Sequence, residues 1–98
     1  MEPGLNRYTW ESEMSGLEED LETSPAETLP ELDQLVARML DEAEVDDPDL
    51  VTEFDAAHAV TDALERRSDG VSPGDVAAAI NSYRAVFDAV VSRNARST

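Results

Sequence analysis

The only histidine of the chain, His58, lies among acids at helical spacing, with Asp55 three residues before it and Asp62 four residues after it. Residues three and four apart share one side of a helix, so these side chains could hold a divalent cation with help from another helix. A di-iron bundle needs two Glu-x-x-His motifs, and the sequence contains none. The simpler interpretation is an exposed, readily protonated histidine, with Asp62 placed to pair with Arg66. Asp55, His58 and Asp62 are therefore the only metal-ligand candidates, and we expect no bound metal or other cofactor.

A second concentration of acids is the segment 41–49, DEAEVDDPD, in which six of nine side chains are carboxylic acids. An EF-hand loop requires Asp-x-Asp-x-Asp-Gly and a Glu at position twelve, whereas this segment has no Gly and contains the rigid Pro48. Asp47 instead suits the N-cap of a helix that begins at Pro48. Glu44 and Asp46 have no such structural explanation, so they are candidates for contact with a basic partner.

Nothing else in the sequence resembles a catalytic set. There is no Gly-x-Ser-x-Gly motif, and the segment 72–75, SPGD, lacks the Gly-Lys-Ser/Thr ending of a phosphate-binding loop. The absence of cysteine excludes disulfides and thiolate metal sites. We therefore expect no enzymatic activity and assign no catalytic or cofactor-binding residue.

The net charge limits the classes of partner. The chain carries 23 Asp and Glu against seven Arg and no Lys, which gives a formal charge of −16. Such a surface would repel nucleic acid and anionic membranes, but it would attract a basic protein. Two alternatives stay open, because acidity also favours solubility and is ordinary in a protein adapted to high salt. With no signal peptide and no long apolar run, we expect a soluble cytoplasmic protein.

The apolar residues recur at helical period in four segments. They predict an all-α fold, a compact bundle of about four helices in which the last two form an antiparallel hairpin. The approximate bounds are 9–23, 29–45, 48–67 and 73–93. Residues 1–8 show no periodicity, so we expect a mobile N-terminal tail before a single helical domain, 9–98.

Proline marks the start of the three later helices. Each start pairs a cap residue with a proline at the first helical position: Ser24-Pro25, Asp47-Pro48 and Ser72-Pro73. Pro30 follows only five residues after Pro25 and disfavours a continuous helix there. We therefore expect a short turn at 25–28, with Ser24 and Thr28 as successive caps, before the main helix.

The first predicted helix has one narrow apolar stripe. Its residues are Trp10, Met14, Leu17 and Leu21, at spacings of four, three and four. The stripe could cover the core made by the other helices, which is favoured because a small protein needs all its apolar surface. It could also dock on another protein, with Trp10 as the anchor.

The last predicted helix is apolar on two sides. Opposite its large side chains lies a row of small ones: Ala78, Ser82, Ala85 and Ala89. The favoured interpretation is close packing against the preceding helix of the hairpin. The alternative is a homodimer interface formed by this row.

Two functional hypotheses follow. The first is a non-enzymatic protein-interaction module, an adaptor or regulator that binds another protein. The alternative is an acidic decoy that occupies the basic nucleic-acid-binding cleft of its partner, as antitoxins, anti-sigma-like inhibitors and DNA mimics do. Decoy binding would depend on electrostatics and weaken steeply with salt. A metal-binding helical protein comes third.

Overall fold

The computed structural model describes the backbone of residues 3–66 and 70–96, and the side chains of residues 8–66 and 70–92. These residues form four helices and no strand. The helices are α1 (Pro3–Thr23), α2 (Pro25–Glu42), α3 (Pro48–Glu65) and α4 (Pro73–Arg96). The predicted all-α, four-helix fold is confirmed.

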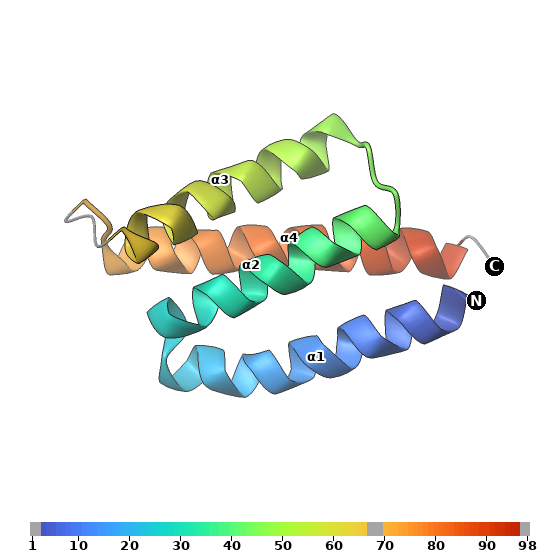
Figure 1. Ribbon diagram of the computed structural model, residues 1–98, viewed down its shortest axis with the longest axis horizontal. Coiled ribbons are helices and arrows are strands. Elements are labelled where there is room, and N and C mark those ends of the chain that lie inside the picture. Colours follow the sequence, from blue (N-terminus) through green and yellow to red (C-terminus); the bar gives the residue numbers. More distant parts are fainter. Residues whose placement is uncertain (1–2, 67–69, 97–98) are drawn as a thin grey trace.

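Successive helices run in opposite directions, and α2 and α4 cross the middle of the molecule (Figure 1). The outer helices α1 and α3 lie on either side and do not contact each other within the described residues. The bundle is therefore flattened, with principal extents of 45 × 28 × 17 Å. The closest packing is between α3 and α4, which confirms the predicted antiparallel hairpin.

The core is supplied unequally by the four helices. Most of its buried apolar side chains come from α2 and α4, and α1 adds Trp10, Met14 and Leu21. By contrast, α3 buries only Ala57 and Thr61. Its large apolar side chains, among them Leu50 and Phe54, pack against the core while remaining partly exposed. Because α3 lies on the flank of the bundle, it presents apolar surface that the other helices hide.

The first helix begins earlier than its periodicity predicted. α1 starts at Pro3, so residues 3–8 belong to a helix rather than to a tail without structure. Proline suits the first helical position, because its missing N–H would have no partner there. Residues 1–2 of the predicted tail lie outside the described part of the chain.

The predicted turn at 25–28 is wrong, because α2 runs without interruption through Pro30. Pro30 leaves the carbonyl of Ala26 without its helical donor, at a cost of about 3 kcal/mol in a helix interior. On either side of it, Leu29 and Leu32 are completely buried. Two buried leucines contribute about 3–6 kcal/mol, so packing outweighs the local penalty.

The predicted caps of α2 are also wrong. The side chain of Ser24 makes no capping hydrogen bond. Thr28 does not begin a helix; it is buried, and its hydroxyl donates to the carbonyl of Ser24 at 2.8 Å. A threonine inside a helix often uses this bond to satisfy its hydroxyl, so here the hydroxyl serves burial and not capping.

The start of α4 is a reciprocal capping box, as the sequence predicted. The amide of Asp75 donates to Oγ of Ser72 at 3.1 Å, and the amide of Ser72 donates to Oδ2 of Asp75 at 3.0 Å. Two amides that a helix start leaves without partners are thereby satisfied. From this start α4 extends to Arg96, three residues beyond the predicted end.

Candidate interaction surface

The apolar stripe of α1 packs on its own domain. Trp10, Met14 and Leu21 are buried and Leu17 is half-buried. The indole of Trp10, only 1% exposed, also donates from Nε1 to Oε1 of Glu42 on α2 at 2.8 Å. In this conformation the stripe has no free surface for a partner, so the intramolecular alternative is the one that the structure adopts.

The row of small residues on α4 lies on the outside of the bundle. Ala78 and Ala85 are exposed, and Ser82 and Ala89 are partly exposed. The predicted packing of this row against α3 is therefore wrong. Contact with α3 is instead made from the large side chains of α4, through Tyr83, while Ser82 donates from Oγ to Oε2 of Glu53 at 3.0 Å.

The acidic segment 41–49 begins with the end of α2. The amide of Val45 donates to the carbonyl of Leu40 at 3.0 Å, and the amide of Glu44 donates to the carbonyl of Asp41 at 3.1 Å. This pair of bonds is a Schellman motif, which requires a left-handed residue after the cap. Glu44 takes that conformation with φ of 53°. Glu44 thus has a structural place after all, and α2 ends at Glu42 rather than at the predicted residue 45.

The same segment ends with the start of α3. Oδ1 of Asp47 accepts from the amide of Asp49 at 2.9 Å, and Pro48 is the first helical residue. This confirms the predicted cap. The Schellman motif and the cap together make a short connection that turns the chain from α2 into α3. It also holds Val45 next to Leu40, since such motifs usually pair these two positions.

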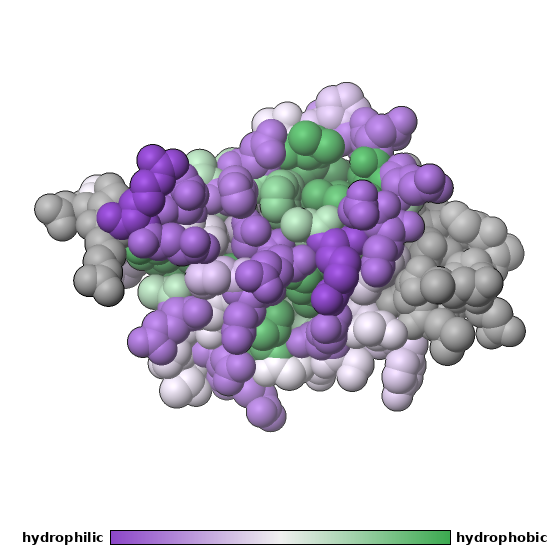
Figure 2. All heavy atoms as spheres, in the orientation of Figure 1, coloured by the Kyte–Doolittle hydropathy of each residue, from purple (hydrophilic) through white to green (hydrophobic). Residues whose placement is uncertain are grey.

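Five apolar side chains surround this connection and remain partly or largely exposed. We call them the α2–α3 patch: Leu40, Val45, Leu50, Val51 and Phe54. Val51 is 39% exposed, the largest value of any described Val, Leu, Ile, Met or Phe. Figure 2 shows apolar atoms at the surface over the first half of α3 and the adjoining end of α2, bordered by hydrophilic side chains.

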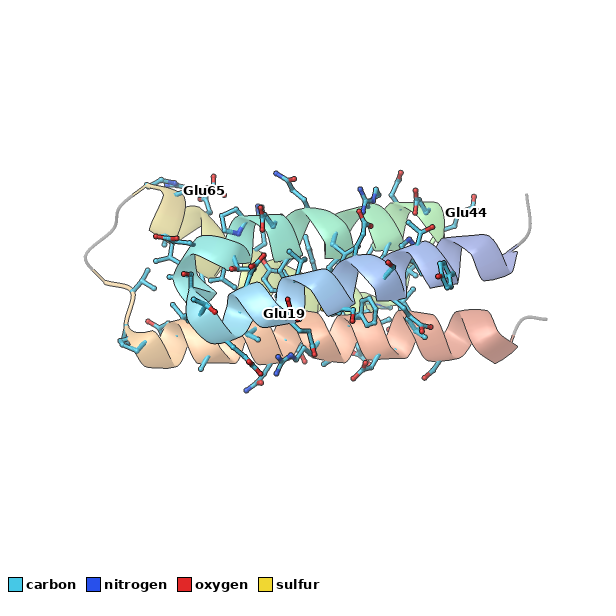
Figure 3. All side chains as sticks on the ribbon, turned by 90° about the horizontal axis from the view of Figure 1, so that it is seen from below. Glu19, Glu44 and Glu65 are labelled. Carbon is cyan, nitrogen blue, oxygen red and sulfur yellow. The ribbon has the colours of Figure 1, made fainter. Side chains whose placement is uncertain are left out.

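Five exposed carboxylates border the patch. We call them the acidic rim: Asp41, Glu44, Asp46, Asp49 and Asp55. Figure 3 places Glu44 at the end of the bundle where α2 meets α3. The described arginines pair elsewhere, Arg38 with Glu13, Arg66 with Asp62 and Arg84 with Glu18. Within the residues whose side chains are described, no basic group neutralises the rim.

Behind the patch lies a polar cluster that joins three helices. Oδ2 of Asp33 on α2 accepts from the hydroxyl of Tyr83 on α4 at 2.6 Å and lies 2.7 Å from Nδ1 of His58 on α3. The hydroxyl of Thr61 lies 2.7 Å from that of Tyr83. Tyr83 has one hydroxyl proton, which it gives to Asp33, so Thr61 is the donor in their bond. Tyr83 and Thr61 are buried, whereas the side chain of His58 is 55% exposed.

The cluster sets the protonation of two of its members. The hydrogen bond to Asp33 raises the pKa of His58 above its ordinary 6.5, and the nearby charges of Asp62 and Asp55 act in the same direction against a small effect of burial. Burial, followed by the hydrogen bond to Asp33, raises the pKa of Tyr83 far above its ordinary value. Tyr83 therefore stays neutral and acts as a fixed donor rather than as an acid or base.

Phe54 connects this cluster with the patch. Its ring stacks on that of His58 with centroids 5.6 Å apart, and it meets the ring of Tyr83 edge-on at 6.0 Å. Both arrangements are favourable for aromatic pairs. The polar cluster therefore fixes the aromatic member of the patch from below while leaving part of its ring at the surface.

The candidate metal ligands are not brought together. Among the described side chains, no three His, Asp or Glu groups lie close enough to hold a metal ion. His58 turns to Asp33, and Asp62 pairs with Arg66 as the sequence predicted. The sequence interpretation missed Asp33, although a signal was present. Asp33 lies four residues after Leu29 and three before Val36, on the edge of the apolar stripe of α2. An acid at such a position needs a partner from another helix.

An open groove of about 430 Å³ lies between α1 and α2. Its charged side chains are those of Glu13, Asp20, Glu31 and Arg38, of which Arg38 pairs with Glu13. This lining holds no nucleophile next to a base, and we assign it no chemistry.

No protein family, curated protein or solved structure matches this chain. None of the helices, over their described residues, has the length and the apolar character that a bilayer crossing requires.

Proposed function

We propose that this chain is a non-enzymatic protein-interaction module, an adaptor or regulator, and that it binds a basic protein through the α2–α3 patch. One observation carries the proposal. Val51, Leu50 and Phe54 stay at the surface of a helix that buries only Ala57 and Thr61, while acids with no described basic partner border them. An apolar centre within a polar rim is the usual anatomy of a protein interface.

The arrangement suits binding because its two parts do different work. Partly exposed apolar side chains gain about 25 cal/mol for each Å² that a partner removes from water. Aromatic anchors such as Phe54, held rigidly, lose little conformational freedom on binding. The rim adds attraction at a distance for a partner of opposite charge.

The charge also argues for a partner other than a second copy. Two chains of formal charge −16 that met through this patch would bring their acidic rims together. Like charges in an interface oppose association, so the patch favours a different, basic protein. Homodimerisation through the outer row of α4 remains a separate alternative. We keep the cytoplasmic location expected from the sequence as part of the proposal.

The decoy hypothesis receives less support from this surface. A nucleic-acid mimic needs spaced negative charge but no apolar centre, since the cleft that it occupies is built for phosphates. The α2–α3 patch instead combines both, which favours a partner that buries apolar side chains.

Affinity capture from the native host tests the proposal with a matched pair of variants. Val51→Ser removes the most exposed member of the patch, and Ala78→Ser makes a comparable change on the outer face of α4. The wild-type chain and Ala78→Ser should retain the same protein, and Val51→Ser should lose most of it. Equal retention by all three, with unchanged helical content by circular dichroism, would rule out the patch as the binding surface.

A further inference from the structure

We infer that the partner docks on the α2–α3 patch with a cationic amphipathic helix, in which an apolar stripe is flanked by Lys or Arg. This inference rests on the proposed function and names the chemistry of the element that binds.

The conformation of the docking element follows from the backbone of the patch. Its five side chains come from the end of α2, the start of α3 and the connection between them. Both helices satisfy their own hydrogen bonds, so this surface offers no strand edge to which an extended peptide could add. A proline-rich peptide needs a groove lined with several aromatic rings, and Phe54 is the only aromatic member of the patch. A helix brings its own hydrogen bonds and presents only side chains, so it fits this surface best.

The charge of the docking element follows from the rim. The segment 41–55 contains eight carboxylic side chains and no Lys or Arg, and no Lys or Arg lies anywhere between Arg38 and Arg66 in the sequence. The rim borders the patch from the end of α2, the connection and the start of α3. Basic side chains on either side of an apolar stripe could therefore each reach a carboxylate.

The direct test uses two synthetic peptides of about 14 residues made from Leu and Lys. In one, Leu recurs at i, i+3, i+4 and i+7 and forms a stripe; in the other, the same residues are scrambled so that no stripe forms. Binding to the full chain is followed by amide chemical shifts at about 0.15 M salt. The striped peptide should bind about tenfold more tightly than the scrambled one and shift signals within residues 40–55. Equal affinities, or shifts centred on another face, would overturn the inference.

Two pairs of variants separate the patch from the overall charge. Val51→Ser should weaken the striped peptide about five- to tenfold, and Ala78→Ser should leave it unchanged. The double variant Glu44→Gln, Asp46→Asn removes two rim charges, and Glu19→Gln, Asp20→Asn removes two charges from α1, away from the end that carries Glu44 (Figure 3). The rim variant should weaken binding about three- to tenfold more than its control. Equal losses would mean that net charge alone attracts the peptide, which contradicts the inference.

These results can be told apart from failure of the proposed function. If capture of the host partner depends on Val51 but the two peptides bind alike, the patch is an interface and the inferred helix is wrong. If capture is also independent of Val51, both proposals fail.

Discussion

Tyr83 on α4 donates its phenolic proton to Asp33 on α2, a residue 50 positions away in the sequence, over 2.6 Å. The same phenol accepts from Thr61 on α3. Three helices are therefore fixed to one buried hydroxyl, and Phe54, the aromatic member of the α2–α3 patch, rests on the edge of that ring. The exposed apolar surface is built on a specified polar contact and does not result from loose packing.

Removing this hydroxyl should destabilise the fold. In Tyr83→Phe, the carboxylate of Asp33 loses one donor and Thr61 loses its acceptor, so we expect a loss of about 1–3 kcal/mol in the free energy of unfolding. Urea denaturation followed by circular dichroism measures it. Tyr8→Phe is the matched control, because Tyr8 is 75% exposed and its hydroxyl should matter by less than about 0.5 kcal/mol. Similar losses in both variants would contradict the buried contact.

Stability should fall as His58 loses its proton. The carboxylate of Asp33 raises the pKa of His58 above 6.5 in the folded protein, so folding favours the protonated ring. The resulting stabilisation is complete below pH 6.5 and disappears as the pH rises through the folded pKa. Because the ring is 55% exposed, the change should be small. Denaturation midpoints between about pH 5.5 and about pH 9 should decline for the wild type and stay flat for His58→Gln. The same decline in both proteins would remove His58 as the cause.

Glu44 should be replaceable by glycine with a gain in stability. Its φ of 53° is unfavourable for a side chain but ordinary for glycine, so Glu44→Gly should add about 0.5–1 kcal/mol to the free energy of unfolding. Glu44→Gln keeps the strain and should give no such gain. Both variants lack the carboxylate, so both should bind the striped Leu–Lys peptide less well. A glycine variant that is no more stable than the glutamine variant would contradict the assigned backbone conformation.

Trp10 should report the packing of α1 by its fluorescence. It is the only tryptophan and is 1% exposed, so the native protein should emit at shorter wavelength than the unfolded chain and resist quenching by acrylamide. A native spectrum already typical of indole in water would mean that α1 is free to bind elsewhere.

Much of the fold could be predicted because its signals are local. Proline at the first position of α2, α3 and α4, the cap at Asp47 and the box of Ser72 with Asp75 depend only on neighbouring residues. The remaining features depend on tertiary packing. Burial of Leu29 and Leu32 carries α2 through Pro30, which local propensity opposes.

The candidate site was harder to predict for the same reason. His58 takes its partner from α2 and not from its own helix, so the spacing of Asp55 and Asp62 was misleading. Glutamate in place of the usual glycine concealed the Schellman motif at Glu44. Periodicity identifies the apolar face of α3, but it does not say that a flanking helix leaves part of that face open.

The most direct test of the α2–α3 patch is amide hydrogen exchange of the full chain, measured with and without the partner captured from the host. We predict that the partner slows exchange mainly within residues 40–55, which hold the whole patch and the whole acidic rim. Slowing confined to the outer face of α4 around Ala78 and Ala85, or no slowing in a saturated complex, would contradict the proposed interaction surface.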